Sequence, residues 1–409
     1  MYTNQLPVQN SSSWFAAKRW STVVVIGTAM ITGCVQPPQP PRGASSSEHP
    51  DVNVFLGESR FDDQTIFSGE RFPNVVVTSD GTVLAIWGGI ARDNRGRVRI
   101  RRSEDGGATW GPEITVANPG FHGGGAIVDE RSGDVLVFAE AGHPPSPLSI
   151  YRSKDQGKTW ALQPTVIQPD EKGQVPSMHM NERGITLRKG PHAGRLLRPC
   201  RSYGAGNGRE YWNTHYTNAI YSDDAGITWK TSRPFPALGT GEATLAELTD
   251  GRIYYNSRRH LSTDGRDPRR RHVAWSDDGG HSWKDLSVSA ELPDGEQDRD
   301  YGLMAGLVRL PVANRDILIF SNIESDNGRR RGTVWASFDG GVTWPIKRLA
   351  QEGGFAYSSL AVGVPGTASE GWIYLLYEQP GENGTTGKMI RFNLTWLLNG
   401  KDIAAYFAR

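Results

Sequence analysis

The stretch Ser222-Asp-Asp-Ala-Gly-Ile-Thr-Trp229 decides the fold, because its pattern Ser-x-Asp-x-Gly-x-Thr/Ser-Trp occurs five times in the chain. The other copies are SEDGGATW from Ser103, SKDQGKTW from Ser153, SDDGGHSW from Ser276 and SFDGGVTW from Ser337. Successive copies start 50, 69, 54 and 61 residues apart, a spacing that fits one propeller blade per repeat.

The Asp-x-Gly core of each octamer is typical of a tight turn. An Asp side chain accepts hydrogen bonds from nearby backbone N–H groups, and Gly adopts positive φ without strain. The closing Trp is expected to pack between neighbouring sheets. We therefore interpret the octamers as structural turns at the blade periphery, and the alternative of a ligand site formed by their Asp side chains is disfavoured.

A turn followed by a short apolar run occurs six times. These runs are Gly81–Ile86, Gly133–Phe138, Gly194–Leu197, Gly251–Tyr255, Asp316–Phe320 and Gly371–Leu375. Each of the first five is followed by an octamer, and the sixth is not. Six such strands near the centres of six sheets predict an all-β, six-bladed β-propeller of four-stranded antiparallel blades. Only Asn393–Leu398 predicts a short helix.

Composition excludes several classes of protein. The chain has 45 Lys and Arg residues and 44 Asp and Glu residues, so it lacks the excess of basic residues that is typical of nucleic-acid-binding proteins. Nine His residues show no metal-ligand spacing, and no Cys-x-x-Cys or His-Glu-x-x-His occurs. We expect no metal, no other cofactor and no nucleic-acid partner.

The N-terminal residues 1–33 contain no acidic residue and are predicted to be an export signal. Lys18 and Arg19 precede an apolar run, Val23–Ile31, that is too short to span a bilayer. The ending Ile-Thr-Gly-Cys34 resembles a bacterial lipobox, which implies a lipid on Cys34 and an envelope-anchored protein. An ordinary signal, giving a periplasmic or secreted protein, is the alternative.

Residues 34–51 are rich in Pro and Ser and read as an extended tether, so the propeller is assigned to residues 52–409. If Cys34 carries a lipid, Cys200 has no partner for a disulfide. We expect a monomer that meets the membrane through the lipid alone.

The octamers resemble the Asp boxes of the sialidase (neuraminidase) family, and the resemblance covers roughly residues 55–409. Arg71-Phe-Pro is similar to the family's Arg-Ile-Pro motif, with Phe in place of Ile. The run from Glu242 through Asp-Gly-Arg to Asn-Ser-Arg258 closely matches a family segment. Ala-Tyr357-Ser-Ser-Leu matches Ala-Tyr-Ser-Asp-Leu, with Ser359 replacing Asp.

This resemblance implies a role for each matching residue. Tyr357 corresponds to the nucleophile, Glu242 to its base, and Asp93 to the general acid/base. Three arginines correspond to the clamp on the substrate carboxylate: Arg71, Arg258 and Arg329. Two alternatives stay open, Glu247 for the glutamate and Arg331 for the third arginine.

The chemistry of sialic acid explains these residue types. Its anomeric carbon bears a carboxylate, which guanidinium groups hold through charge-assisted, partly bidentate hydrogen bonds. A neutral phenol approaches that carboxylate without the repulsion that an Asp or Glu nucleophile would meet. The family therefore implies a retaining exo-α-sialidase acting on sialylated glycans. A non-catalytic sialic-acid-binding propeller, a purely structural propeller and a trans-sialidase are the rival interpretations.

Overall fold

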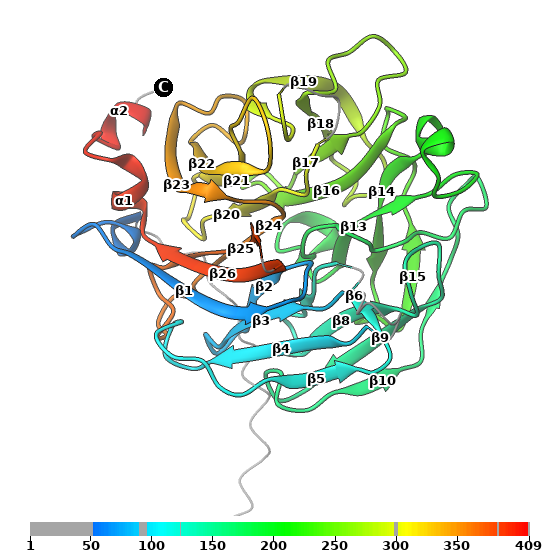
Figure 1. Ribbon diagram of the computed structural model, residues 1–409, viewed down its shortest axis with the longest axis horizontal. Helices are drawn as coiled ribbons and strands as arrows, with labels where there is room; N and C mark the ends of the chain where they lie inside the picture. Colours follow the sequence, from blue (N-terminus) through cyan, green and yellow to red (C-terminus); the bar gives the residue numbers. More distant parts are fainter. Residues whose placement is uncertain (1–51, 90–95, 123, 298–301, 383, 408–409) are drawn as a thin grey trace, which may run out of the picture. The chain divides into compact units, whose positions relative to one another are not determined.

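The computed structural model describes residues 52–89, 96–122, 124–297, 302–382 and 384–407. The predicted export signal at 1–33 and the tether at 34–51, with Cys34, lie outside the described residues, as does Asp93. These assignments therefore stay predictions. The described residues form six sheets, whose main strands pair antiparallel and which are arranged as the blades of a propeller (Figure 1). This arrangement confirms the predicted fold.

Four blades have four strands each. Blade 1 contains β2 (Asn74–Val77), β3 (Val83–Trp87), β4 (Val98–Ser103) and β5 (Ile114–Ala117). Blade 4 contains β16 (Thr240–Glu247), β17 (Ile253–Arg259), β18 (Arg270–Ser276) and β19 (Lys284–Pro293). Blade 5 contains β20 (Gly306–Arg309), β21 (Leu318–Ile323), β22 (Arg330–Ser337) and β23 (Ile346–Gly354). Blade 6 contains β24 (Ser358–Val362), β25 (Ile373–Gly381), β26 (Gly384–Phe392) and β1 (Phe61–Ser68).

Two blades have a fifth, very short strand, which is a small departure from the prediction. In blade 2 the first strand is divided into β6 (Phe121–His122) and β7 (Ile127–Val128), followed by β8 (Val135–Glu140), β9 (Leu148–Ser153) and β10 (Ala161–Gln163). Blade 3 contains β12 (Ile185–Thr186), β13 (Leu196–Ser202), β14 (Tyr216–Ser222) and β15 (Thr228–Thr231), and β11 (Val166–Ile167) pairs in parallel with β15.

Each of the six predicted apolar runs forms the second strand of a blade: β3, β8, β13, β17, β21 and β25. These strands are buried along almost their whole length, because sheets of neighbouring blades cover both of their faces. Each octamer begins on the last residue of a third strand and leads toward the fourth. Blade 6 has no octamer because its fourth strand, β1, comes from the opposite end of the chain (Figure 1).

The octamer from Ser222 satisfies its own polar groups. The Ser222 hydroxyl donates to Asp224 (2.7 Å), and Asp224 accepts from the backbone N–H (2.9 Å) and hydroxyl (2.6 Å) of Thr228. Trp229 is fully buried and its ring lies 5.6 Å from that of Phe138 in blade 2. The octamer is therefore a turn whose Trp fastens one blade to the next.

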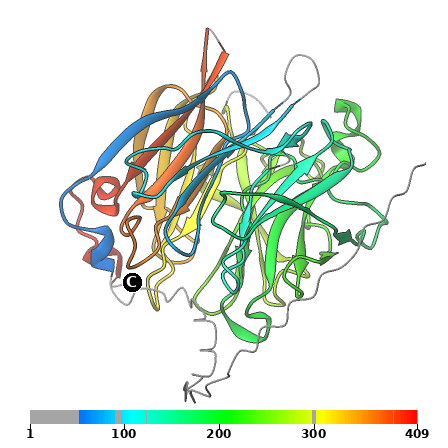
Figure 2. The same ribbon diagram turned by 90° about the horizontal axis from the view of Figure 1, so that it is seen from below.

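Helices are few and short. The 3₁₀ helices are η1 (Val52–Phe55), η2 (Gly190–His192) and η3 (Arg209–Thr214), and the α-helices are α1 (Leu394–Leu398) and α2 (Ala404–Phe407). The predicted helix is confirmed as α1, whose N-cap is the Asn393 side chain. The two ends of the described chain lie side by side, where η1 packs with the C-terminal helices (Figures 1 and 2). Within the described ranges, no helix has the length and apolarity needed to cross a membrane.

Trp229→Ala should lower the free energy of unfolding by about 3–5 kcal/mol, because it leaves a cavity between blades 2 and 3. Trp160 provides a matched control, since its indole N–H makes the same bond to an octamer Gly but its ring is only half-buried. Trp160→Ala should cost clearly less. Urea unfolding of both variants measures the difference, and equal losses would contradict an inter-blade role for Trp229.

Candidate functional site

The first strands of neighbouring blades contact one another around the centre of the propeller. Tyr357 directly precedes β24, Arg71 lies shortly before β2, and Glu242 lies in the first half of β16. Arg258 lies near the end of β17, which runs antiparallel to β16, and Arg329 directly precedes β22. The fold thus brings these five side chains, predicted from motifs, to one end of the central strands.

Glu242 and Arg258 form a buried ion pair, with 2.5 Å between Oε1 and Nη1 and side chains at most 1% exposed. A buried carboxylate and guanidinium are each costly to desolvate, and the close contact offsets part of that cost. The pair gives the centre of the site a fixed anionic oxygen beside the tyrosine.

Tyr357 lies among the charged groups of the site. The guanidinium carbon of Arg71 is 5.2 Å from the centre of its ring, and that of Arg329 is 5.0 Å away. Burial raises the pKa of Tyr357, and the Glu242 carboxylate raises it further, while Arg329, Arg258 and Arg71 oppose the shift. Because the net pKa shift is upward, the phenol is neutral in the resting protein at neutral pH.

Glu378 is a site residue that the sequence analysis missed. Its Oε2 lies 2.9 Å from Arg71 Nη2, and its Oε1 accepts from the backbone N–H of Phe72 at 2.8 Å. Glu378 also exchanges backbone hydrogen bonds with the segment of Tyr357. The one signal in the sequence was the apolar run at Gly371–Leu375, which continues to Glu378 and so ends on a charged residue.

The two alternative residues lie elsewhere. Glu247 is at the far end of β16, where its carboxylate accepts from the backbone N–H groups of Arg188 (2.7 Å) and Lys189 (2.9 Å). Arg331 pairs with the exposed Glu352 at 2.7 Å, away from Tyr357. The structure therefore groups Glu242 and Arg329 with Tyr357, and it groups neither alternative with them.

An aromatic cluster flanks Tyr357 on the side of blade 2. The ring of Phe72 lies 6.2 Å from that of Tyr357, 5.2 Å from that of Phe121 and 5.3 Å from that of His179. His143 continues the cluster, 4.7 Å from His179. Phe72 belongs to the Arg71-Phe-Pro motif, but Phe121, His143 and His179 carry no motif, so sequence reasoning did not find the cluster. The cluster gives the site an apolar wall beside its charged centre.

A second flank, from blades 3 and 4, is polar. Arg201 lies over the ring of Tyr203 (4.3 Å), and its Nη2 contacts His215 Nδ1 (3.0 Å) and His260 Nε2 (3.1 Å). Burial, together with the charge of Arg201, lowers the pKa of His215 to about 4, so this imidazole is a neutral acceptor. In the part of the chain that the structure describes, no group of three or more His, Cys, Asp or Glu side chains is placed to hold a metal ion.

Comparison with protein families gives a match to the BNR repeat-like domain over residues 81–368, well over half of the chain. The chain belongs to the BNR repeat-like family. All five octamers fall within the matched residues.

Curated relatives include sialidases. The chain is 30% identical over 427 residues to the sialidase of Micromonospora viridifaciens, covering 97% of this chain and 61% of that protein. It is 28% identical over 340 residues to the sialidase of Bacteroides fragilis, covering 71% of this chain and 57% of that protein. The chain thus spans about six-tenths of the length of these relatives.

Solved structures share the propeller fold. The Hadza microbial sialidase Hz136 superposes with a TM-score of 0.61 at 23% identity, covering 80% of this chain and 66% of that one. The intramolecular trans-sialidase of Ruminococcus gnavus gives 0.63 at 16% identity, covering 82% and 98%. At these identities the likeness concerns the fold alone.

Arg258→Met should destabilise this family member by about 3–5 kcal/mol, because it leaves the Glu242 carboxylate buried without its partner. The double variant Glu242→Gln/Arg258→Met removes both charges and should recover part of that loss. Urea unfolding of the two single variants and the double variant gives the coupling energy. Strictly additive losses would contradict the ion pair.

Proposed function

We propose that this chain is an exo-α-sialidase that hydrolyses terminal sialic acids on glycoconjugates with retention of configuration. One observation carries the proposal: a buried tyrosine lies within about 5 Å of two guanidinium groups and beside a carboxylate–guanidinium pair. The sialidases among the curated relatives support the same chemistry.

In this proposal the arginines hold the substrate carboxylate. Arg71, Arg258 and Arg329 are fixed at the same end of the central strands, and Glu378 anchors the guanidinium of Arg71. Guanidinium groups present donors in a planar fork that matches a carboxylate. Because the sialic acid carboxylate sits on the anomeric carbon, holding it also holds the reacting carbon over Tyr357.

The reaction proceeds in two steps. Tyr357 Oη attacks the anomeric carbon and passes its proton to Glu242, while Asp93 protonates the departing glycosidic oxygen. Asp93 then takes a proton from water, which attacks the same carbon and breaks the bond to Tyr357. Tyr357 recovers its proton from Glu242, so both proton carriers return to their starting states. Two displacements at one carbon give retention.

We also propose that the protein acts outside the cytoplasm, held to the cell envelope by a lipid on Cys34. The support is the pattern of residues 1–34, with its basic residues, short apolar run and lipobox-like ending. A sialidase in that position would meet sialylated glycans in the surroundings of the cell.

Tyr357→Phe should lower kcat on a fluorogenic α-sialoside by about 10³-fold or more, because the nucleophilic oxygen is lost. The rings pack alike, so the free energy of unfolding should change little. Unchanged hydrolysis in the variant would refute the nucleophile. Absence of hydrolysis in the unaltered protein, with sialic acid still bound, would instead favour a non-catalytic binding module.

Arg329→Ala should raise KM about 10- to 100-fold, since charge-assisted hydrogen bonds to the substrate carboxylate are lost. Arg331→Ala is the matched control, because its guanidinium forms only an exposed ion pair with Glu352. Its KM should stay close to that of the unaltered protein. A larger KM for Arg331→Ala than for Arg329→Ala would instead assign Arg331 to the substrate carboxylate.

A further inference from the structure

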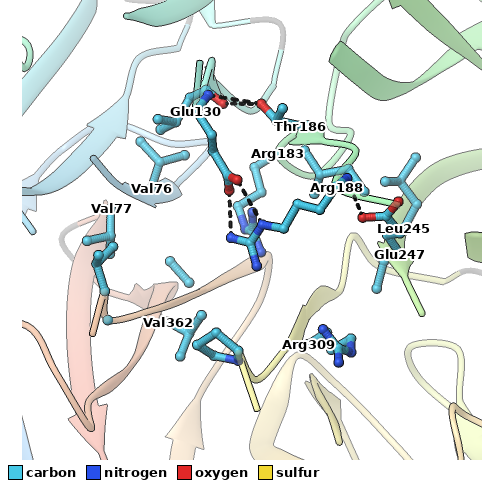
Figure 3. Close-up of a pocket in the computed structure, with 18 of the residues that line it drawn as sticks. Val76, Val77, Glu130, Arg183, Thr186, Arg188, Leu245, Glu247, Arg309 and Val362 are labelled. Carbon is cyan, nitrogen blue, oxygen red and sulfur yellow. Dashed lines mark hydrogen bonds and ion pairs between the residues drawn. The ribbon is translucent and has the colours of Figure 1, made fainter. Parts of the chain in front are cut away.

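A cavity of about 130 Å³ lies at the end of the central strands opposite Tyr357 (Figure 3). Its lining includes the last residues of the first strands of all six blades: Val77, Val128, Thr186, Glu247, Arg309 and Val362. The candidate active site lies at the starts of the same strands. Tyr357 and Val362 are five residues apart on an extended strand, roughly 17 Å, so the two sites are distinct.

Most charged groups at the cavity already have partners. Arg188 reaches Glu130 with two hydrogen bonds, 2.8 Å from Nε and 2.7 Å from Nη2 (Figure 3). Glu247 accepts two backbone N–H groups, and Arg309 pairs with Asp316 at 3.0 Å. These groups shape the cavity wall and have little hydrogen-bonding capacity left for a ligand.

Arg183 is different. Its Nε donates to the backbone oxygen of Leu360 at 2.9 Å, but its two terminal nitrogens donate to no acceptor among the described residues. The neighbouring Glu182 carboxylate is occupied by the Ser359 hydroxyl (2.8 Å) and the Leu360 N–H (3.0 Å). The guanidinium lies beside the Arg188–Glu130 pair at the cavity, with its terminal fork available (Figure 3).

The remaining lining is largely apolar. It includes Val76, Leu245, Pro311, Val364 and Pro365. A cavity of about 150 Å³ that is lined by apolar side chains accommodates benzene. The present cavity therefore has room for a ligand with an aliphatic chain of about three to five carbons. The Arg183 fork, next to this apolar part of a wall that also carries the paired charges, matches a ligand with a carboxylate head and a short aliphatic tail.

We propose that this cavity is a binding site for a small aliphatic carboxylate, held by the terminal nitrogens of Arg183. The apolar tail packs against the valines and prolines of the strand ends. The site is separate from the catalytic pocket, and its occupancy does not depend on the proposed sialidase activity.

Isothermal titration of the full-length protein with butyrate tests the proposal, with butyramide as the neutral isostere. Butyrate should bind one to one, and butyramide at least about tenfold more weakly. Arg183→Met should weaken butyrate by at least about tenfold as well. Arg266→Met is the control, because Arg266 lies on an exposed loop and pairs with Asp264. Its Kd for butyrate should be unchanged.

Val364→Phe provides a second variant that leaves Arg183 in place and fills the apolar part of the cavity. It should abolish butyrate binding and retain binding of formate, so the proposal stays testable even if Arg183→Met fails to fold. The proposal would be overturned if both variants bound butyrate with the same Kd as the unaltered protein. It would also be overturned if the unaltered protein showed no saturable butyrate binding. Displacement of butyrate by sialic acid would indicate that butyrate binds at the Tyr357 site, and this result would also overturn the proposal.

Discussion

Closure of the ring is the constraint on which the rest of the structure depends. Strand β1 pairs with β26 along its length, from Phe61 opposite Phe392 to Ser68 opposite Thr386. Without β1, blade 6 would present β26 as an open edge, with unpaired backbone groups. The same pairing sets the position of Arg71, three residues after β1, beside Glu378 on β25. One inter-strand register therefore closes the fold and also brings Arg71 to Glu378 across its seam.

The charges in the centre are better explained by chemistry than by stability. The Glu242–Arg258 pair is almost fully buried, and Glu378 is buried beneath Arg71. Such pairs gain little over well-packed apolar side chains, because desolvation offsets much of their attraction. What they supply is fixed geometry in a dry site; in the proposed reaction, a substrate carboxylate and a developing phenolate would meet charges that need no rearrangement. The raised pKa of Tyr357 fits this account, since the hydroxyl keeps its proton until a base takes it.

The sequence was most informative where a pattern is local. The second strand of every blade is covered on both faces, so it begins with a continuous apolar run. The octamers are equally local, because their hydrogen bonds close within a few residues. Outer strands such as Ala161–Gln163 are short and exposed and carry no such signal. Glu378 was missed for a related reason: its partner Arg71 is 307 positions away, and only the register of blade 6 brings the two together.

The spacing of the motifs left two choices open, Glu242 or Glu247 and Arg329 or Arg331. The strand geometry distinguishes the members of each pair. Glu242 and Glu247 lie five residues apart on one extended strand, roughly 17 Å, so they cannot serve the same site. Arg329 and Arg331 are two residues apart, and regular strand geometry would place both on one face. Arg331 instead has a φ of 58°, and the register of β22 against β23 shifts between Arg330 and Gly332. This irregularity directs Arg331 to Glu352 and leaves Arg329 over Tyr357. A bulge is invisible in a motif, yet here it separates the arginine at the tyrosine from the one that faces solvent.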